Sequence, residues 1–265
     1  MKFRTLISAA ALGATLTATP AAAVTREEAT VDNAMLVLRE LQAIPDQQIP
    51  DLLLSRAEGL VILPANVKVG LIFGARFGNG VMLVRRPDRS WSNPVFVSTG
   101  GGSWGFQAGG QVSDIVLVLT TRQSVEGITD GKLTLGADAS VAAGPVGRTA
   151  MASTSVTFDS EVYAYSRSQG LFAGVSLEGN GIFIGKKANR RFYDGEASAA
   201  AIIAQTDPAP APAAELVAQV TRLTSSANDS VASEDLKKKE EVAKERPTEA
   251  KTYPMEDQEP GAEPR

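Results

Sequence analysis

The sequence predicts an α+β fold built on a strongly curved or closed, barrel-like antiparallel β-sheet, with N-terminal helices and one C-terminal helix packed on it. Short apolar or β-branched runs follow one another at intervals of roughly ten residues between residues 59 and 185. Helical spacing of apolar residues precedes these runs and returns after them. The 24 glycines, beside an aromatic content of only 6%, are typical of a bent sheet with many tight turns.

The first 23 residues have the pattern of a signal peptide. Lys2 and Arg4 form a positive start, residues 5–17 are apolar, and residues 21–23 are the small residues of a cleavage site. The apolar run is shorter than the ~20 residues that a transmembrane helix needs. We therefore expect an exported chain that begins near Val24, in the periplasm of a Gram-negative bacterium or secreted, and peripheral on a membrane. A buried N-terminal helix remains the alternative.

Two helices are expected next. Thr25 and Glu28 have the spacing of a capping box. Behind them an apolar stripe recurs at helical spacing until Pro45, and a short second helix covers 50–58. The stripe that should dock the first helix on the sheet consists of Val31, Ala34, Met35, Leu38 and Leu41.

The sheet follows from residue 59 onward. A turn at 86–89 joins two of its strands, 189–193 reads as a turn or single helical turn, and 196–204 as a closing helix. Strands of this spacing form an antiparallel meander rather than βαβ units. The predicted strands are 60–63, 81–84, 95–97, 115–120, 155–158, 162–166, 171–177 and 181–185.

The chain divides into the signal peptide 1–23, a folded domain 24–206 and a tail 207–265. The tail begins with a stiff Pro/Ala linker and carries a net charge of −5, against −4 for the whole chain. We expect one short amphipathic helix in it, and disorder from Thr224 onward. The apolar residues of that helix are Leu216, Val217, Val220 and Leu223.

Composition excludes several kinds of chemistry. The chain contains no Cys and no His, which excludes thiolate metal sites, Cys nucleophiles and imidazole bases. The net charge of −4 is not that of a nucleic-acid-binding protein. We predict no catalytic residue, no metal and no cofactor. A hydrolase that uses scattered carboxylates is the weakest of the hypotheses, and its candidates are Asp114, Asp130, Asp138, Asp159, Glu161 and Glu178.

One dense basic cluster stands out in the folded region. Four cations beside aromatic rings have the chemistry to hold the phosphates of an anionic lipid headgroup. The alternative is a solvated loop with ordinary ion pairs. Arg85 and Arg86, with Arg89, form a weaker second candidate at the hairpin tip. The main cluster consists of Lys186, Lys187, Arg190 and Arg191, with Phe192 and Tyr193.

Leu171 and Phe172 have two interpretations. They follow a Ser-Gln-Gly turn, so they are candidates for a tip that inserts into a membrane or for the lining of a lipid cleft. The alternative is a strand buried on both faces, with glycines where backbones approach closely.

Two long segments stand out, 140–148 (SVAAGPVGR) and 163–179 (YAYSRSQGLFAGVSLEG). Both closely resemble the SYLF domain family. The resemblance covers about 56–204. It implies a lipid-binding domain, which in eukaryotic members binds phosphoinositides with help from a basic N-terminal stretch and in some fungal members binds actin. It implies no catalytic residues, and it implies that bacterial members are exported envelope proteins. The shorter segments that match in order are Ala57-Glu58-Gly59 with Pro64, Trp91-Ser92 with Pro94, Gly109 with Asp114, and Asn189 with Phe192-Tyr193.

The first helix departs from the eukaryotic pattern because acidic residues outnumber its cations. An anionic surface would repel it, so we expect it to dock on the sheet instead. The sequence predicts a non-enzymatic, lipid-binding envelope protein that recognises anionic phospholipid headgroups at a membrane surface. The alternative is an envelope scaffold that binds another protein through its surface or its C-terminal tail.

Overall fold

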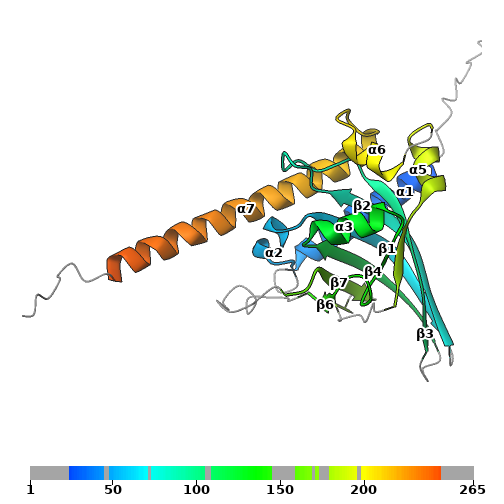
Figure 1. The fold of residues 1–265 in the computed structure, drawn as a ribbon, viewed down its shortest axis with the longest axis horizontal. Helices are drawn as coiled ribbons and strands as arrows, with labels where there is room; N and C mark the ends of the chain where they lie inside the picture. Colours follow the sequence, from blue (N-terminus) through cyan, green and yellow to red (C-terminus); the bar gives the residue numbers. More distant parts are fainter. Residues whose placement is uncertain are drawn as a thin grey trace, which may run out of the picture.

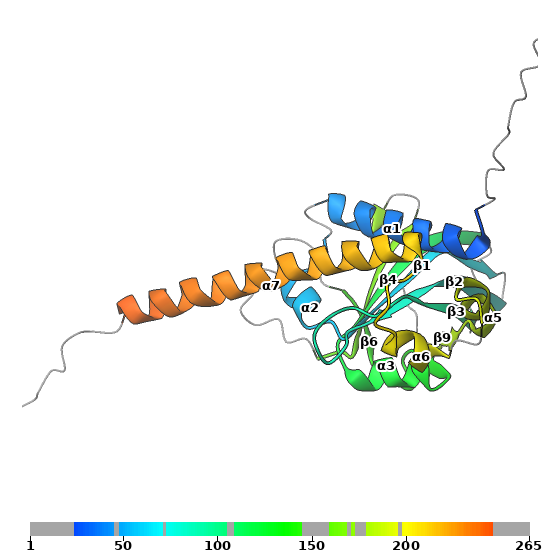
Figure 2. The same ribbon diagram turned by 90° about the horizontal axis from the view of Figure 1, so that it is seen from above.

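A nine-stranded sheet forms the centre of the molecule, and helices cover both of its faces (Figures 1 and 2). The computed structural model describes residues 24–44, 48–70, 73–104, 109–144, 159–168, 171–172, 179–195 and 198–245. The predicted signal peptide and the predicted strand at 155–158 lie outside these residues. The predicted α+β class with a strongly curved antiparallel sheet is confirmed.

The strands pair antiparallel throughout, except that β6 and β7 run parallel. Their order across the sheet is β5-β9-β3-β2-β1-β4-β7-β6, and β8 also pairs with β7. The strands are β1 (Gly59–Gly70), β2 (Phe73–Val84), β3 (Val95–Trp104), β4 (Gly109–Leu119), β5 (Lys132–Thr134), β6 (Val141–Ala143), β7 (Val162–Ser168), β8 (Leu171–Phe172) and β9 (Gly181–Ile184).

The helices begin where the sequence supplies caps. The capping box of the first helix is present, because the Thr25 side chain accepts from Glu28 N at 3.2 Å and Glu28 Oε2 accepts from Thr25 N at 2.7 Å. A helix at 122–129 was not expected, and Thr121 caps it by accepting from Ser124 N. The described helices are α1 (Arg26–Ala43), α2 (Asp51–Ser55), α3 (Arg122–Thr129), α5 (Lys186–Phe192), α6 (Ala199–Ala204) and α7 (Ala211–Glu245).

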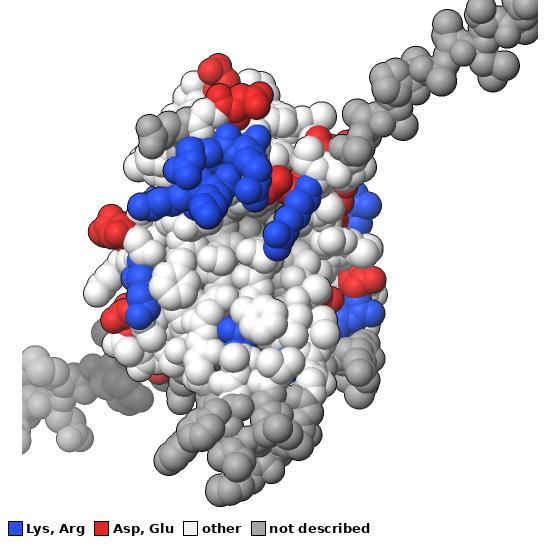
Figure 3. Space-filling view, turned by 90° about the vertical axis from the view of Figure 1, so that its right-hand side faces the viewer, with Lys and Arg blue, Asp and Glu red and all other residues white. Residues whose placement is uncertain are grey.

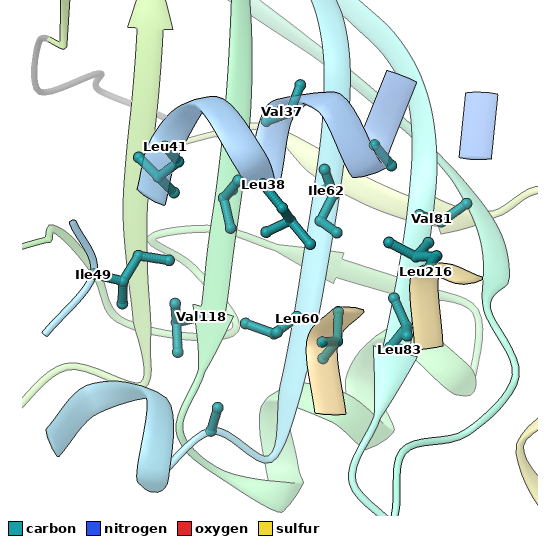
Figure 4. Close-up of a cluster of buried hydrophobic side chains, with 14 of the residues drawn as sticks. Val37, Leu38, Leu41, Ile49, Leu60, Ile62, Val81, Leu83, Val118 and Leu216 are labelled. Carbon is teal, nitrogen blue, oxygen red and sulfur yellow. The ribbon is translucent and has the colours of Figure 1, made fainter. Parts of the chain in front are cut away.

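The two faces of the sheet bury separate hydrophobic clusters. On one face, which we call the outer face, α1, α2 and α7 pack against the strands, as Figure 4 shows for Leu38, Leu60 and Leu216. On the other, the inner face, α3 and α6 pack against residues such as Met82 and Leu117. Side chains alternate between the two faces along each strand. The predicted apolar stripe of α1 is buried against the outer face, so the expected docking of this helix is confirmed.

The sheet curls because its two edges are connected by a short segment. β5 lies at one edge and β6 at the other, yet only residues 135–140 separate them. Leu135 and Ala139 in this segment are buried in the inner cluster, and a β-bridge pairs them. The connection therefore crosses the inner face, which makes that face the concave one.

A β-bulge in β1 adds to the curvature. The pairing register between β1 and β2 shifts between Ile62 and Val67. Within the bulge Ala65 has a φ of 51°, and its backbone N–H donates to Asp114 Oδ1 at 2.9 Å. Gly80 lies opposite, where an added Cβ would be only 2.0 Å from the carbonyl oxygen of Ile62. Glycine is required there because the two backbones approach so closely.

The C-terminal segment differs from the expectation of disorder after Thr224. α7 runs without a break from Ala211 to Glu245 and projects beyond the domain (Figures 1 and 2). Two features of the sequence explain why this helix is so long. The segment has no glycine or internal proline after Pro212, and acidic residues precede lysines by four positions three times. The first half also packs on the core, where Trp91 Nε1 donates to Thr224 Oγ1 at 2.9 Å.

Candidate functional site

The basic cluster lies on a helix, α5, rather than on a turn. α5 follows β9 directly, so its cations extend from the end of a strand at one side of the sheet. Lys186, Lys187, Arg190 and Arg191 are all exposed on it. Figure 3 shows Lys and Arg side chains gathered into one patch at the position that α5 has in Figure 1.

Asn189 fixes this helix to the sheet. Its side chain is fully buried, with 0% exposure. The amide oxygen accepts from Phe96 N at 2.8 Å, and the amide nitrogen donates to Phe96 O at 3.4 Å. The carbonyl of Phe96 also accepts from Gly185 N at 2.8 Å. β3 therefore determines where α5 begins and how it is oriented.

Within the described part of the chain, Arg191 differs from the other three cations because it has a carboxylate partner. Its Nε and Nη2 both donate to Oε1 of Glu27 in the first turn of α1, with an Nε to Oε1 distance of 2.9 Å. Glu27 is buried although the guanidinium of Arg191 is more than half exposed. This pair holds α5 against α1 and neutralises one of the four charges.

An open pocket of about 380 Å³ lies between α1, α5 and the middle of β2 and β3. Three of the predicted cations line it, namely Lys186, Lys187 and Arg191, and Arg26 of α1 joins them. Glu27 is the one carboxylate in this lining, and it pairs with Arg191. The arrangement leaves a net positive pocket that suits a phosphate group.

Phe192 and Tyr193 do not point outward with the cations. The ring of Phe192 lies 5.0 Å from the ring of Phe96, edge to face, and 5.0 Å from that of Tyr193. Tyr193 Oη donates to Pro94 O at 2.6 Å, and burial raises the pKa of this phenol. Both rings pack against the core and attach α5 to the sheet.

Arg85 and Arg86 are not part of this site, which corrects the weaker of the two expectations. Arg85 is 3% exposed, stacks 4.3 Å over the ring of Trp91, and donates to backbone carbonyls. Burial, followed by the charge of Arg89, lowers the pKa of Arg85 to about 10. Arg86 donates to the carbonyls of Ile203, Gln205 and Trp91. These guanidiniums hold the hairpin in place through backbone carbonyls, and Arg85 Nη2 alone has no hydrogen-bond partner among the described residues.

Leu171 and Phe172 form the short strand β8, which pairs with Arg167 and Ser168 of β7. A strand here agrees with one of the two sequence interpretations. Their side chains lie outside what the structure describes, so the choice between membrane tip and buried strand stays a prediction.

On the outer face, the part of the sheet that α1 does not cover exposes apolar side chains to solvent. This exposed face was not predicted from the sequence. Phe77, Val69 and Val112 are 51%, 43% and 52% exposed. They share one face because Val67 pairs directly with both Phe77 and Val112, and Val69 follows two residues later on β1. No sequence signal joins them, because the pairing register alone brings them together.

This apolar face continues from the basic pocket. Asn79 lines the pocket, and Phe77 lies two residues away on the same side of β2. Figure 3 shows the patch of cations above a broad area with very few charged residues. A cationic rim beside an exposed apolar area is a combination found at membrane and protein interaction sites.

Comparisons with known proteins point in one direction. A family described as "Ysc84: Las17-binding protein actin regulator" matches residues 100–223. "SH3 domain-containing YSC84-like protein 1" of Rattus norvegicus is 39% identical over 189 residues, which are 69% of this chain and 55% of that protein. "Protein YSC84" of Saccharomyces cerevisiae is 42% identical over 151 residues, which are 56% of this chain and 32% of that protein. The chain thus spans about half the length of the first of these relatives and about a third of the second.

Proposed function

Because the chain belongs to the Ysc84/SYLF domain family, we propose that it is a non-enzymatic protein that binds anionic phospholipid headgroups at a membrane surface. The description of the family refers to binding and regulation rather than to catalysis. The observation that carries the proposal is the position of three cations of α5, which have no carboxylate partner among the described residues, beside an exposed apolar face. These cations are Lys186, Lys187 and Arg190.

Electrostatics and burial would act together in this mode of binding. Each Lys or Arg close to an anionic membrane surface contributes ~1 kcal/mol. Partial burial of Phe77, Val69 and Val112 in the interfacial region would add a hydrophobic contribution. The pocket beside Lys186 and Lys187 would take one phosphate of a headgroup, while Arg191 keeps its pairing with Glu27.

We further propose that the protein acts in the bacterial periplasm after export. The pattern of residues 1–23 supports this, as described above. In the part of the chain that the structure describes, no helix combines the length and the apolar character needed to cross a membrane.

Sedimentation with vesicles tests the proposal. The chain from residue 24 onward is mixed with phosphatidylglycerol or cardiolipin vesicles, and with phosphatidylcholine vesicles as a reference. We expect binding to the anionic vesicles alone, weakened by added salt. The variant Lys186→Glu/Lys187→Glu/Arg190→Glu should lose this binding and remain folded, because its three side chains are exposed.

A matched control comes from α7. Lys237, Lys238 and Lys239 are also exposed, and reversing them changes the net charge by the same amount. This control should bind anionic vesicles as the unaltered protein does. Equal loss in both variants would show a response to net charge only, and unchanged binding in the α5 variant would refute the proposed site.

A second candidate function is a scaffold that binds another protein. The observation in its favour is that α7 projects well beyond the domain (Figure 2). The apolar stripe of the predicted tail helix is not free to bind a partner, since Leu216 and Val220 are buried in the outer cluster. A deletion from residue 207 would therefore remove part of the core. A truncation after residue 230 spares these contacts, and the lipid proposal expects it to leave vesicle binding unchanged.

A further inference from the structure

The inner face of the sheet becomes polar beyond the core, near the C-terminal end of β1 and the N-terminal end of β2. Arg76 lies on this face because it is six residues from Met82 along β2, and the pairing of β2 with β3 has no irregularity between them. Lys68 pairs directly with Arg76 across β1 and β2, so the two cations lie side by side. Ser113 and Asn66 pair on the same face, between β4 and β1.

Arg76 is a buried cation without a counterion among the described residues. Its side chain is 6% exposed, and its Nη1 has no hydrogen-bond partner there. Burial lowers the pKa of this guanidinium. Burying an ion costs free energy that opposite charges or hydrogen bonds must offset, and Nη1 has neither among the described residues.

Asn66 is a second buried group without partners, and it lies next to Arg76. It is 1% exposed, and neither its amide oxygen nor its amide nitrogen has a hydrogen-bond partner in the described part of the chain. An added Cβ at Gly78 would lie 2.5 Å from Asn66 Nδ2. The amide therefore lies over Gly78, the next residue after Arg76 on this face of β2.

No carboxylate of the four central strands faces this group. Between residues 59 and 119 the sequence contains only two, Asp88 and Asp114. Asp88 belongs to the turn after the opposite end of β2. Asp114 follows Ser113 and so points to the outer face, although its carboxylate accepts from Ala65 N in the bulge. The described strands thus place two cations and a free amide together with no acid.

From this arrangement we infer that Arg76, Lys68 and Asn66 form a phosphate-binding site on the inner face. The planar guanidinium donates two parallel hydrogen bonds to phosphate oxygens, Lys68 adds a second charge, and the Asn66 amide donates a further bond. Two cations favour a dianionic phosphate over a singly charged carboxylate. The site is reached from the strand ends, where Lys68 is partly exposed and Gln111, its partner on β4, is exposed.

This site is separate from the membrane surface proposed above and does not depend on it. α5 packs through Phe192 against Phe96 of the outer cluster, whereas Arg76 lies on the inner face. The phosphate could belong to free inorganic phosphate or to a phosphorylated amphiphile, and the experiment distinguishes these two sources.

The test titrates the protein with inorganic phosphate and, separately, with n-hexyl phosphate, by calorimetry and by thermal unfolding. We expect heat of binding and a raised Tm. Binding of both probes assigns the site to free phosphate, and binding of hexyl phosphate alone assigns it to an amphiphile. Either result supports the site. No binding of either probe overturns it.

Variants decide whether the response comes from this site. Arg76→Met should abolish the ligand-induced rise in Tm and raise Tm in phosphate-free buffer, because it removes an unpaired buried charge. Lys68→Gln, at a partly exposed position, should weaken binding by about tenfold or more, and it tests the site even if Arg76→Met fails to fold. Because the pocket beside α5 also suits a phosphate, the titrations and both substitutions are measured in the Lys186→Glu/Lys187→Glu/Arg190→Glu background, in which that pocket has lost the lining cations Lys186 and Lys187. We expect the background protein to bind both probes through the inner face. No binding in this background, or an unchanged response after Arg76→Met and Lys68→Gln, would overturn the inference.

Discussion

The carboxylate of Glu27, buried in the first turn of α1, accepts two hydrogen bonds from the guanidinium of Arg191 on α5. The two residues are 164 positions apart, so the pair connects the start of the domain with its basic helix. Because this ion pair neutralises the charge of Arg191, three of the four predicted basic residues remain available to bind a ligand. It also holds the wall of the pocket that Lys186 and Lys187 line.

Glu27→Gln should strengthen binding to anionic vesicles. Glutamine keeps an oxygen acceptor for Arg191 but leaves the arginine charge uncompensated, which adds ~1 kcal/mol of attraction, or about a fivefold increase in affinity. The free energy of unfolding should fall by about 1 kcal/mol or less, since Arg191 is largely exposed. Vesicle sedimentation and urea unfolding measure the two effects. Glu28→Gln is the control, because Glu28 does not line the pocket and glutamine still completes the capping box. An equal gain in vesicle affinity in both variants would contradict the prediction.

Asn189→Ala should lower the free energy of unfolding by about 2 to 3 kcal/mol. The change leaves the backbone N–H of Phe96 buried without its acceptor and removes the attachment of α5 to β3. Arg190→Ala, at the exposed neighbouring position, should stay within about 0.5 kcal/mol of the unaltered protein. Urea unfolding of both variants tests this, and a cost for Asn189→Ala no greater than that of its neighbour would refute the role of the amide.

Gly80→Ala should be among the most damaging single changes in the sheet. The added Cβ would lie 2.0 Å from the backbone carbonyl of Ile62, which cannot move without breaking the bulge. We expect a loss of more than about 4 kcal/mol, or failure to fold. Gly102→Ala is the matched control, because the nearest atom to its Cβ is 3.9 Å away. Circular dichroism and thermal unfolding measure the stability of both variants. Equal stability of the two would contradict the close approach of Gly80 to the carbonyl of Ile62.

Two tyrosines should resist ionisation until the protein unfolds. Burial raises the pKa of Tyr165 and of Tyr193 above the ordinary value of 10.0. The unfolded chain therefore loses these phenolic protons first as the pH rises, so their contribution to stability is complete below about pH 10 and declines above it. Alkaline titration of tyrosinate absorbance should show an abrupt rise at unfolding. In Tyr193→Phe that rise should shrink by one tyrosine, and a smooth titration of all tyrosines near pH 10 would disagree with this prediction.

Local sequence patterns predicted the parts of the fold that depend on near neighbours. The capping box at Thr25 and the stripe of α1 are such parts, and both are present in the structure. The helix after Thr121 escaped notice although it carries the same kind of signal, a hydroxyl cap followed by Val125 and Ile128 three residues apart. α7 is longer than predicted because helix propensity and the spacing of its charges stabilise a helix even where its surface is polar.

The candidate site could be predicted only in part, because much of it depends on contacts between distant segments. The cations of α5 are adjacent in sequence and were found. The pairing of Arg191 with Glu27 and the burial of Arg85 against Trp91 follow from tertiary packing that no local pattern encodes. The apolar face of Phe77 and Val112 follows from strand register in the same way.

The short strands at the two sheet edges have a consequence for self-association. β5 and β6 are three residues each, whereas the four central strands have ten to twelve. An edge this short offers few free backbone groups of its own for a strand of another molecule to pair with. Among the described residues, β3 after Gly100 and β4 before Ser113 have no strand on their outer sides, so an added strand would find its longest free edge there rather than at β5 or β6.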